Sequence, residues 1–511
     1  MKKVFVYLAM LLQNSIACAQ QNDYGKVWVQ GAFRIYTSTF DGIDVTNDVF
    51  AISPNLVFAL GHSNISDSTG SLKLISDGFR IFDAQTDTIV NGGQIVQNEM
   101  FNTAISNFYA QSSIFLPLAK NMYILINASA SDYEINTYWK QPSTGRALFD
   151  LLFYNLIDMD AHNGQGAVVR KMHPLLQGVE LSKSQMMATR HGDGKSWWLL
   201  KQASDTNMVY KFLITADSIY GPFVQGFHAP RFSRNDLGGQ SMFSQDGTLY
   251  ATTCRGAGKI FVADFDRCSG DLSNPRVFDL PAYTFINPWD NTPIVDSFSE
   301  GLCFSPNGRF IYVSSYYHIH QLDLQDNDPN TRWYKVADLD TTIDFFQSYS
   351  SLALAPNNKV YIGNWAGFSG QMSAINEPDE KGAACEFCPR CLRFPKYQFQ
   401  SVGVTQPPCM PNYKLGATNP PCWPMGITPV EKEIPIRIYP NPANDMVHIE
   451  YAEPGLLELI DLTGRVYRSI RLEEQMGSYT VDIRDAVPGL YIYRWLVDGQ
   501  PKENGKLMIG R

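Results

Sequence analysis

Three cysteines at regular spacing form the pattern in this sequence that most resembles a metal site. Cys385, Cys388 and Cys391 are each separated by two residues, and Cys409 or Cys422 can supply a fourth thiolate. Four thiolates are a common ligand set for structural zinc. The same cysteines can instead form disulfides, and the redox compartment of the protein decides between the two chemistries.

Two histidines give a second and weaker pattern for metal binding. His318 and His320 are two residues apart in a stretch that is typical of a β-strand, so their side chains share one face. No third ligand stands beside them in the sequence. We therefore interpret them as polar residues on a strand surface or a channel wall.

Two acidic stretches also lack the complete pattern of a cation site. Asp158, Asp160 and Asn163 resemble the start of a calcium loop, but Val169 occupies the twelfth position, where such a loop has glutamate. The second stretch, DLQDNDPN at residues 323–330, is expected to be a solvated loop.

The sequence offers no recognisable catalytic constellation. It contains no G-x-S-x-G motif for a serine nucleophile and no glycine-rich phosphate loop. A glycosidase needs two carboxylates at a defined separation, and with 50 Asp and Glu residues no such pair can be named from sequence. We assign no catalytic, cofactor-binding or metal-binding residue and no cofactor, and whether the chain is an enzyme is left open, with a non-enzyme favoured.

Composition limits the classes of fold and partner. The formal charge is -9 and lysine and arginine form no cluster, which argues against nucleic-acid binding because phosphates need a basic surface. Hydrophobic residues make up 44% of the 511 residues and aromatic residues 13%, so the chain has enough apolar surface to fold. The aromatic content favours β structure.

The first nineteen residues have the pattern of a cleavable export signal. Lys2 and Lys3 precede an apolar run at residues 4–12, and Ala17-Cys18-Ala19 provides the small-x-small pattern of a cleavage site. A membrane-spanning helix takes roughly 20 apolar residues, so no transmembrane segment is predicted here or later in the chain. Lipidation of Cys18 is the competing interpretation.

After cleavage, eight cysteines remain, and their even number in an oxidising compartment favours disulfides over zinc. Eight cysteines allow 105 pairings, so the sequence does not determine the connectivity. Cys254 and Cys268 lie on the two arms of one predicted hairpin, and we therefore select them as the candidate disulfide.

Short β runs that share one plan fill the chain from about residue 28 to residue 374. Each has an apolar strand, a tight turn with Asp or Asn, and a second apolar strand. Asn-Gly and Asp-Gly pairs favour the tight turns of β-hairpins. The turn residues lie 44, 72, 53, 61 and 50 positions apart and are Asp77, Asn121, Asp193, Asp246, Asn307 and Asn357. Four-stranded propeller blades repeat at roughly 40–50 residues. We predict an all-β fold with a WD40-like β-propeller of about seven blades over residues 20–416, with six or eight blades left open.

The chain changes character after residue 385. A Pro- and Cys-rich stretch up to residue 425 is interpreted as an irregular closure of the propeller, and residues 417–434 as a linker. Residues 435–511 alternate apolar and polar positions between closely spaced turns. This pattern is typical of a small Ig-like β-sandwich.

The C-terminal stretch closely resembles the type A sorting domain of the type IX secretion system, also called the Por secretion tail. The matching positions occur in the family's order and are Tyr439, Pro440, Asn441, Pro442, Gly464, Gly489, Tyr491 and Lys506. The resemblance implies a Bacteroidetes protein that the type IX translocon and sorting machinery recognise. It also implies that the domain is removed and that the protein is secreted or held at the outer cell surface.

The larger domain is similar to secreted Bacteroidetes propellers. The similarity is carried by segments such as QSSIFLPLAKNMYILIN and CFSPNGRFIYVSSYYHIHQLDL and ends with MPNYKLG at residue 416. Relatives of this kind mostly lack an assigned activity. The resemblance therefore implies fold and location and transfers no catalytic residue.

Three functions remain open from the sequence. We favour a non-catalytic binding module for an unknown protein or glycan, because a propeller presents loops on a rigid disc. The alternatives are a secreted polysaccharide- or peptide-acting hydrolase or lyase, and an envelope scaffold or gliding-associated component. Carboxylates lining one mouth would favour the enzyme. Aromatic residues that could stack on sugars, or pack inside blades, are Trp139, Trp289, Trp333 and Trp365.

Overall fold

The computed structural model describes fourteen segments of the chain: residues 22–103, 109–140, 148–204, 206–226, 238–287, 290–340, 348–364, 370–395, 406–422, 436–439, 441–451, 453–473, 477–497 and 499–510. The predicted signal peptide at residues 1–19 and most of the predicted linker lie outside these ranges. The chain divides into two compact units, Met1–Pro421 and Cys422–Arg511, and each is described by itself.

Side chains in the strand-joining turns explain why the predicted hairpins form. In FSQDGTLY, the Asp246 carboxylate accepts hydrogen bonds from the Ser244 hydroxyl at 2.6 Å and the Thr248 amide at 3.0 Å. Gly247 follows with φ of +71°, a conformation that glycine adopts without strain. Asn307 has the same two kinds of contact in its own turn. The turn sequence thus fixes the hairpin register.

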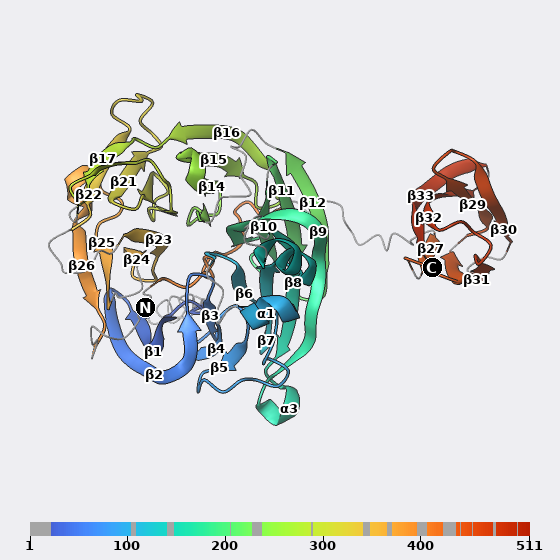
Figure 1. Ribbon diagram of the computed structural model, residues 1–511, viewed down its shortest axis with the longest axis horizontal. Helices are drawn as coiled ribbons and strands as arrows, with labels where there is room; N and C mark the ends of the chain where they lie inside the picture. Colours follow the sequence, from blue (N-terminus) through green and yellow to red (C-terminus); the bar gives the residue numbers. More distant parts are fainter. Residues whose placement is uncertain are drawn as a thin grey trace, which may run out of the picture. The chain divides into compact units, whose positions relative to one another are not determined.

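The first unit is a ring of seven groups of strands among the described residues, and the β-propeller prediction is confirmed (Figure 1). The strands before the seven-stranded sheet are β1 Val27–Asp41, β2 Asp44–Phe58, β3 Ser63–Ser66, β4 Leu72–Ser76 and β5 Ile81–Asp83. Those after it are β13 Ser241–Phe243, β14 Leu249–Cys254, β15 Lys259–Phe265, β16 Leu272–Asp279, β19 Gly301–Phe304, β20 Phe310–Ser314, β21 His318–Asp323, β22 Trp333–Asp338, β23 Tyr349–Leu354, β24 Val360–Asn364, β25 Gln371–Ile375 and β26 Phe387–Arg393.

Two neighbouring blades share one long strand. The seven-stranded sheet contains β6 Ser113–Ala119, β7 Met122–Ser129, β8 Phe149–Asp158, β9 Ala167–Arg190, β10 Trp197–Ala203, β11 Met208–Ile214 and β12 Ile219–Gly226. The first part of β9 pairs with β8 up to Leu181, and the part after Leu181 pairs with β10. The strand is therefore the last of one blade and the first of the next, which explains part of the 72-residue gap between two predicted turns.

The turn at Asp77 joins two strands, as predicted, but it is not the first turn of its blade. It joins β4 to β5, the second and third strands of its blade, where Asp77 is buried and its carboxylate accepts from the Phe79 amide at 2.8 Å. The turn between the first two strands of this blade is formed by residues 67–71, around Asp67. Both turns use an aspartate, so sequence alone did not separate them.

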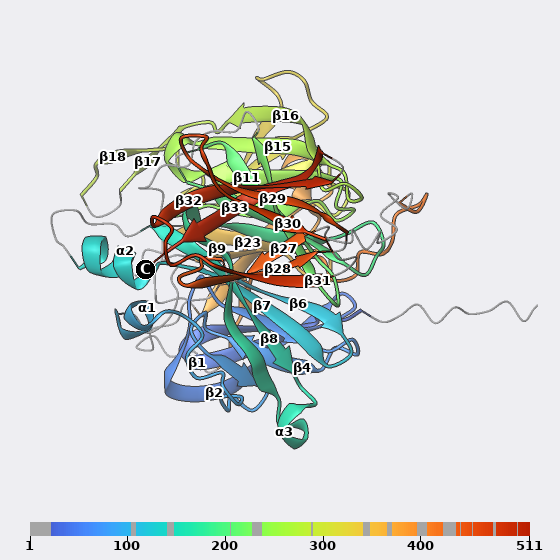
Figure 2. The ribbon, with the colours of Figure 1, turned by 90° about the vertical axis from the view of Figure 1, so that its right-hand side faces the viewer.

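Short helices and one extra hairpin extend from the ring. The helices are α1 Asn98–Thr103, α2 Asp132–Glu134, η1 Ile135–Trp139, α3 Ala161–Gly164, η2 Arg255–Ala257 and η3 Gly382–Cys385. The hairpin is formed by β17 Tyr283–Ile286 and β18 Pro293–Asp296. Figure 2 shows α1, α2 and this hairpin on the same side of the ring. Among the described residues, no helix combines the length and apolar character needed to cross a membrane.

The second unit is a small β-sandwich, as predicted. One sheet has the order β27 Ile436–Tyr439, β28 Met446–Tyr451, β31 Gly477–Asp482, and the other the order β30 Val466–Leu472, β29 Gly455–Asp461, β32 Gly489–Val497, β33 Gln500–Ile509. A core of apolar residues lies between the sheets, with Leu457, Trp495 and Leu507 fully buried. Alternation along each strand, with a period of two residues, produces this buried face.

Candidate functional site

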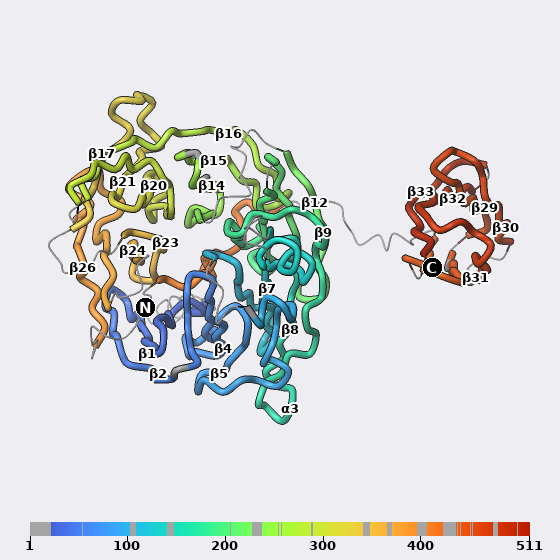
Figure 3. Tube along the Cα trace, in the orientation of Figure 1, coloured from blue at the N-terminus to red at the C-terminus, as the bar shows by residue number. Residues whose placement is uncertain are grey.

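An irregular segment, residues 406–418, crosses the inside of the propeller ring, and we call it the plug. It has no regular secondary structure and is visible as the orange trace within the ring (Figure 3). Gln406 Nε2 donates to the Asn364 carbonyl at 2.5 Å, and the Cys409 amide donates to the His62 carbonyl at 3.3 Å. These contacts join the last blade to the first blades of the chain.

Further anchors of the plug reach the blades in the middle of the chain. Asn412 Nδ2 donates to the Gln245 carbonyl at 2.8 Å, and the Thr418 amide donates to the Gly192 carbonyl at 2.9 Å. The Arg267 guanidinium donates to the carbonyl of Gly416. Together with a hydrogen bond from Tyr413 to Phe115 on β6, these contacts reach five of the seven strand groups and make the plug a common support for the ring.

Tyr413 is the central side chain of the plug. It is 3% exposed, and its hydroxyl donates to the Phe115 carbonyl at 2.8 Å. Its ring lies 5.8 Å from the rings of both Tyr24 and Trp197, in tilted and edge-on arrangements that aromatic pairs favour. Burial raises the pKa of Tyr413 well above its usual value, so the hydroxyl remains a donor.

A cavity of about 360 Å³ lies beside the plug. The plug forms one wall through Pro408 to Lys414, and the opposite wall comes from the strand ends and turns of several blades. Its walls are rich in apolar side chains, with amide groups at a few positions. The lining residues include Trp28, Met242, Phe243, Gln245, Asn358 and Met410. Size and lining are those of a small ligand site.

The cavity carries almost no charge. Lys414 is the one charged residue among those that line it, and its ammonium pairs with the Asp23 carboxylate at 2.9 Å. No carboxylate or imidazole is among the lining residues of this described pocket. The titratable side chains that line it are Cys303, Tyr413 and Lys414.

A buried lysine lies behind the plug. Lys201 on β10 is fully buried, and its ammonium donates to the Ser184 carbonyl. Burial lowers the pKa of Lys201 to about 7, with a smaller opposing effect of the Cys409 thiol. Burial raises the pKa of Cys409 to about 12, so this thiol remains neutral at physiological pH.

Replacing this lysine should stabilise the protein in a pH-dependent way. Lys201→Met is expected to raise the free energy of unfolding near pH 7 by about 1–4 kcal/mol. The reason is that the methionine side chain, unlike the ammonium group, loses no favourable hydration when it is buried. The Ser184 carbonyl still accepts from the Ser182 hydroxyl at 2.9 Å. The stability gained by Lys201→Met should shrink as pH rises from about 7 toward 10.5. In this range the amine of the folded native protein is neutral, while the amine of the unfolded chain still holds its proton, so the native protein becomes more stable with rising pH. Urea unfolding of both proteins at several pH values measures this. An advantage that stays constant with pH would refute the assignment.

The two predicted strand histidines are buried and do not lie on a strand surface or channel wall. His318 and His320 share one face of β21, under the β17–β18 hairpin, with Tyr283 stacked against His320 at 5.5 Å. His318 Nδ1 contacts Asp338 Oδ1 at 2.9 Å. Burial, then the charge of His318, lowers the pKa of His320 to about 3, so it stays neutral. This cluster joins the hairpin to its blade.

Ser315 lies in the same cluster and is not available as a nucleophile. Its hydroxyl donates to Asp296 Oδ2 at 2.6 Å, while the His318 amide donates to the Ser315 oxygen at 3.1 Å. His320 Nε2 stands 3.4 Å from the same oxygen. The serine is fully buried, so no substrate can reach it without movement of the hairpin.

The cysteines differ from the sequence prediction. Cys268 and Cys422 are disulfide-bonded. The register places Cys254 opposite Lys259 at one end of the β14–β15 hairpin, whereas Cys268 follows Phe265 at the other end. Disulfides need a Cα separation below about 7 Å, so the predicted Cys254–Cys268 pair is incompatible with this register. The prediction failed because it located both residues on the hairpin without fixing their register.

Five further cysteines are free thiols, although the sequence favoured disulfides for them. They are Cys303, Cys385, Cys388, Cys391 and Cys409. Within the described ranges, no group of three or more His, Cys, Asp or Glu side chains is arranged to hold a metal ion. Residues 387–393 also form the outer strand β26, so the expected irregular closure begins later than predicted.

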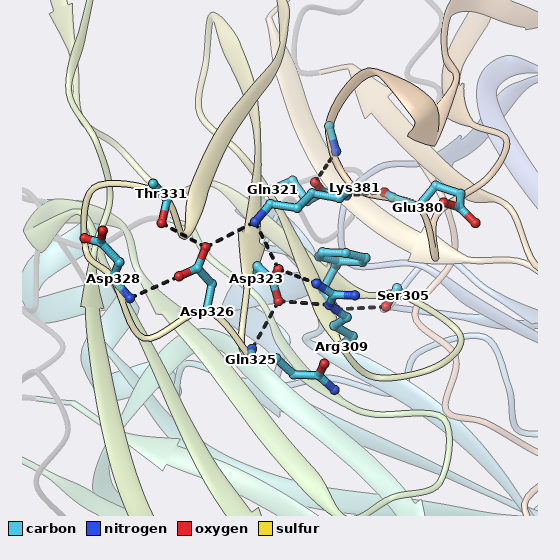
Figure 4. Close-up of polar contacts among 12 residues, drawn as sticks. Ser305, Arg309, Gln321, Asp323, Gln325, Asp326, Asp328, Thr331, Glu380 and Lys381 are labelled. Atoms are coloured by element: carbon cyan, nitrogen blue, oxygen red, sulfur yellow. Dashed lines mark hydrogen bonds and ion pairs between the residues drawn. The ribbon is translucent and has the colours of Figure 1, made fainter.

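Most of the acidic stretch at residues 323–330 is an exposed loop, as expected, but Asp323 and Asp326 also belong to an ion-pair network (Figure 4). Asp323 is 2% exposed and accepts from Arg309 Nε at 3.0 Å and Nη2 at 2.8 Å. The Arg309 hydrogen bonds are the main reason that the pKa of Asp323 is lowered. Lys381 from the next blade pairs with Asp323 at 3.3 Å and with Asp326 at 3.1 Å. The network therefore fastens two neighbouring blades together.

The calcium-like stretch is a hydrogen-bonded turn. Asp160 Oδ1 accepts from Asn121 Nδ2 at 2.7 Å, and Asp158 Oδ1 accepts from the Asp160 amide at 2.8 Å. Of the predicted aromatic loop residues, Trp139 is 39% exposed and Trp333 is partly buried beside His320. Trp289 and Trp365 lie outside the described residues.

The predicted sorting-motif residues occupy key positions in the C-terminal sandwich. Asn441 Nδ2 donates to the Lys506 carbonyl at 2.7 Å, and Asn441 Oδ1 accepts from the Met508 amide at 2.9 Å. The start of the domain is thereby tied to its last strand. The Tyr491 hydroxyl donates to the Val487 carbonyl at 2.9 Å.

The remaining motif positions serve turns and strand ends. Gly464 has φ of +85° in the turn between β29 and β30, where the Asp461 carboxylate accepts from the Thr463 and Arg465 amides. Gly489 begins β32, Pro442 directly follows Asn441, and Tyr439 ends β27. Pro440 lies outside the described residues.

Sequence reasoning missed the plug and Lys201. The plug sequence QPPCMPNYKLG shows no periodicity, and only its Pro content marked it as irregular. Lys201 sits in WWLLKQA, a strand that is buried on both faces, and a continuous apolar run with one lysine was the available signal.

The sequence comparison identifies the C-terminal domain. Residues 437–510 match the family described as "Secretion system C-terminal sorting domain". The match includes all eight predicted motif positions and shows that the chain carries a type IX sorting domain. No curated protein matches the sequence.

Comparison with solved structures finds propeller-like proteins of low identity. A periplasmic gluconolactonase from Pseudomonas aeruginosa is 13% identical, with 95% of this chain and 99% of that chain covered and a TM-score of 0.34. A protein from Lactobacillus plantarum is 12% identical, with 89% and 99% covered and a TM-score of 0.34. Kluyveromyces lactis Hsv2p is 9% identical, with 69% and 90% covered and a TM-score of 0.32. At these scores the fold assignment rests on the ring of sheets itself.

Proposed function

We propose that this exported β-propeller protein, whose C-terminal domain is a type IX sorting domain, is a non-catalytic binding module that holds its ligand in the cavity beside the plug. The sorting domain indicates delivery to the cell surface or the surroundings of the cell. The observation that carries the proposal is a cavity large enough for a ligand group, whose described lining is mostly apolar and holds no carboxylate or imidazole.

The lining argues for binding over hydrolysis. A hydrolase of polysaccharide or peptide needs a nucleophile or an acid–base pair at the reacting bond. The cavity offers methionine, proline, aromatic and amide groups, and its single lysine is held by Asp23. Such a lining contributes apolar contact area and a few oriented hydrogen bonds, which is what recognition requires.

The same lining indicates the chemistry of the ligand. Met242 and Met410 are adaptable apolar side chains, and methionine is frequent on binding surfaces that accept varied partners. Asn358 and Gln245 add uncharged hydrogen-bonding groups. We infer that the cavity receives an uncharged, largely apolar group, such as a side chain or short segment of a partner protein. A glycan is the alternative that the experiment must separate.

The experiment fills the cavity from one wall. Gln245→Trp leaves in place the backbone carbonyl that accepts from Asn412, so the plug anchor remains. The added indole should take up cavity volume and weaken binding by about tenfold or more, a loss of at least about 1.4 kcal/mol. A thermal-shift screen with apolar peptides and neutral oligosaccharides first identifies the ligand class, and titration then compares the variants.

A matched control adds the same side chain outside the cavity. Val277 on β16 of the same blade is 45% exposed, so Val277→Trp should bind as the native protein does. Equal affinity of the native protein and Gln245→Trp would exclude the cavity as the binding site. Stabilisation by oligosaccharides alone would assign the site to a glycan.

The remaining parts of the export route complete the proposal. The N-terminal pattern supports a cleaved signal peptide at residues 1–19, and the sorting domain supports a Bacteroidetes origin. We propose the propeller at residues 20–416, a linker at 417–434 and the sorting domain at 435–511. N-terminal and C-terminal sequencing of the exported protein tests both processing sites.

A further inference from the structure

The outer strand of the last blade contains a bulge between two cysteines. Ala374 on β25 pairs with Cys388 on β26, and Met372 pairs with Leu392. Two steps along β25 therefore face four steps along β26. Arg390 adopts φ of +52°, and its amide donates to the Ser373 hydroxyl at 3.1 Å. The extra residues of β26 are folded out between the two paired positions.

This bulge brings Cys388 and Cys391 together. In a regular strand, residues three apart lie about 10 Å apart and point to opposite faces. Here the span from Cys388 to Leu392 matches two strand steps, about 7 Å. Cys391 precedes Leu392, so the bulge brings its backbone closer to Cys388 than a regular strand would.

Cys391 also contacts Cys388 directly. Cys391 Sγ donates to the Cys388 carbonyl oxygen at 3.4 Å. The pKa of Cys391 is raised to about 12, first by partial burial of its sulfur and then by the Cys388 thiol. The Cys391 sulfur therefore lies beside Cys388 before any bond forms.

Accessibility distinguishes this pair from the other thiols. Cys391 is exposed and Cys388 is half-buried, whereas Cys303, Cys385 and Cys409 are buried. Thiol–disulfide exchange requires access of the attacking or attacked sulfur. Among the described free cysteines, these two are the ones that an external disulfide can reach.

We propose that Cys388 and Cys391 are a redox-active pair that forms a reversible disulfide on the surface of the last blade. One thiolate attacks the disulfide of a small-molecule or protein oxidant, and a mixed disulfide forms while one thiol leaves. The second thiolate then displaces the other half of the oxidant. The protein loses two protons and two electrons, and the oxidant becomes two thiols.

The surroundings of the pair set the pH at which exchange occurs. The charge of Lys359 lowers the pKa of Cys391, but burial of the sulfur and the Cys388 thiol outweigh it. Exchange should therefore be faster at alkaline pH, where more of the thiol is deprotonated. Arg390 lies between the two cysteines in the sequence, and its guanidinium pairs with the Asp340 carboxylate. A disulfide that closes a loop this short stabilises the fold least, so the bond is suited to reduction as well as oxidation.

The test uses the full-length protein and glutathione. Oxidised glutathione should remove two alkylatable thiols per chain, and peptide mapping under non-reducing conditions should locate one bond between Cys388 and Cys391. Reduced glutathione should restore both thiols without unfolding the protein. Cys388→Ser and Cys391→Ser should each form a stable mixed disulfide with glutathione in place of the internal bond.

Cys385→Ser is the matched control, because Cys385 is the next cysteine in the sequence and is buried. This variant should still oxidise to the internal bond. Three outcomes would overturn the proposal: both thiols stay alkylatable in oxidised glutathione, the internal bond is lost in Cys385→Ser, or reduction succeeds only in denaturant.

Discussion

Deletion of residues 437–510 should abolish delivery to the cell surface and leave a folded propeller in the periplasm. The propeller is a compact unit that has its own core, so its folding does not need the sandwich. The deleted residues are the sorting domain that the secretion machinery recognises. Fractionation, followed by protease treatment of intact cells, measures how much protein is exposed.

A point variant tests whether single residues of the sorting motif are needed for delivery. Asn441→Ala removes both hydrogen bonds that tie the start of the sandwich to its last strand, and it should lower delivery. Val487→Ser changes an exposed position, 74% accessible, and should leave delivery intact. Surface display of the deletion variant at the native level would contradict the sorting assignment.

Tyr413→Ala should destabilise the propeller by about 3–5 kcal/mol, the range found when a buried aromatic side chain is removed. The loss combines the packing against Tyr24 and Trp197, the cavity left behind and the hydrogen bond to Phe115. Chemical denaturation of residues 20–434 at neutral pH gives the free energy of unfolding.

The conservative variant shows which interaction matters. Tyr413→Phe keeps the aromatic packing and loses only the hydroxyl, so it should cost about 0.5–1.5 kcal/mol plus the unpaired carbonyl. Equal stability of Tyr413→Ala and the native protein would show that the plug is not part of the folded core. Equal losses in both variants would assign the effect to the hydrogen bond.

Much of the propeller could be predicted from its turns. The motifs around Asp246 and Asn307 combine a serine, an Asp or Asn and a glycine, and these residues bond within the turn itself. Local hydrogen bonds of this kind are encoded within a few residues. Asp77 shows the limit, because an aspartate turn marks a hairpin without saying which two strands of a blade it joins.

Long-range contacts were beyond the sequence. The plug is held by carbonyl groups of distant blades, such as those of His62, Gln245 and Gly192, and backbone acceptors leave no pattern in a sequence. The cysteine pairing failed for a related reason, since it required the register of β14 on β15. The sorting motif was recognised because it is defined by the types of its residues and by their order along the chain, both of which the sequence contains.

The candidate site divides in the same way. The aromatic and amide character of the cavity is present in the composition, but its residues come from segments between Asn22 and Lys414. Only the closed ring brings them together. His318 and His320 were correctly placed on one face of a strand, whereas the hairpin that buries them could not be foreseen from β21 alone.

The most direct test of the account is a binding and turnover assay on residues 20–434. Ligands that shift the melting temperature are incubated with the protein, recovered and analysed by mass spectrometry. A ligand at about 100 times its Kd should stabilise the fold by about 2.7 kcal/mol. The account predicts saturable stabilisation by a ligand that is recovered chemically unchanged, with both the shift and the binding weakened in Gln245→Trp. Recovery of a cleaved product from the native protein would contradict the non-catalytic role, and binding that is unchanged in Gln245→Trp would contradict the site.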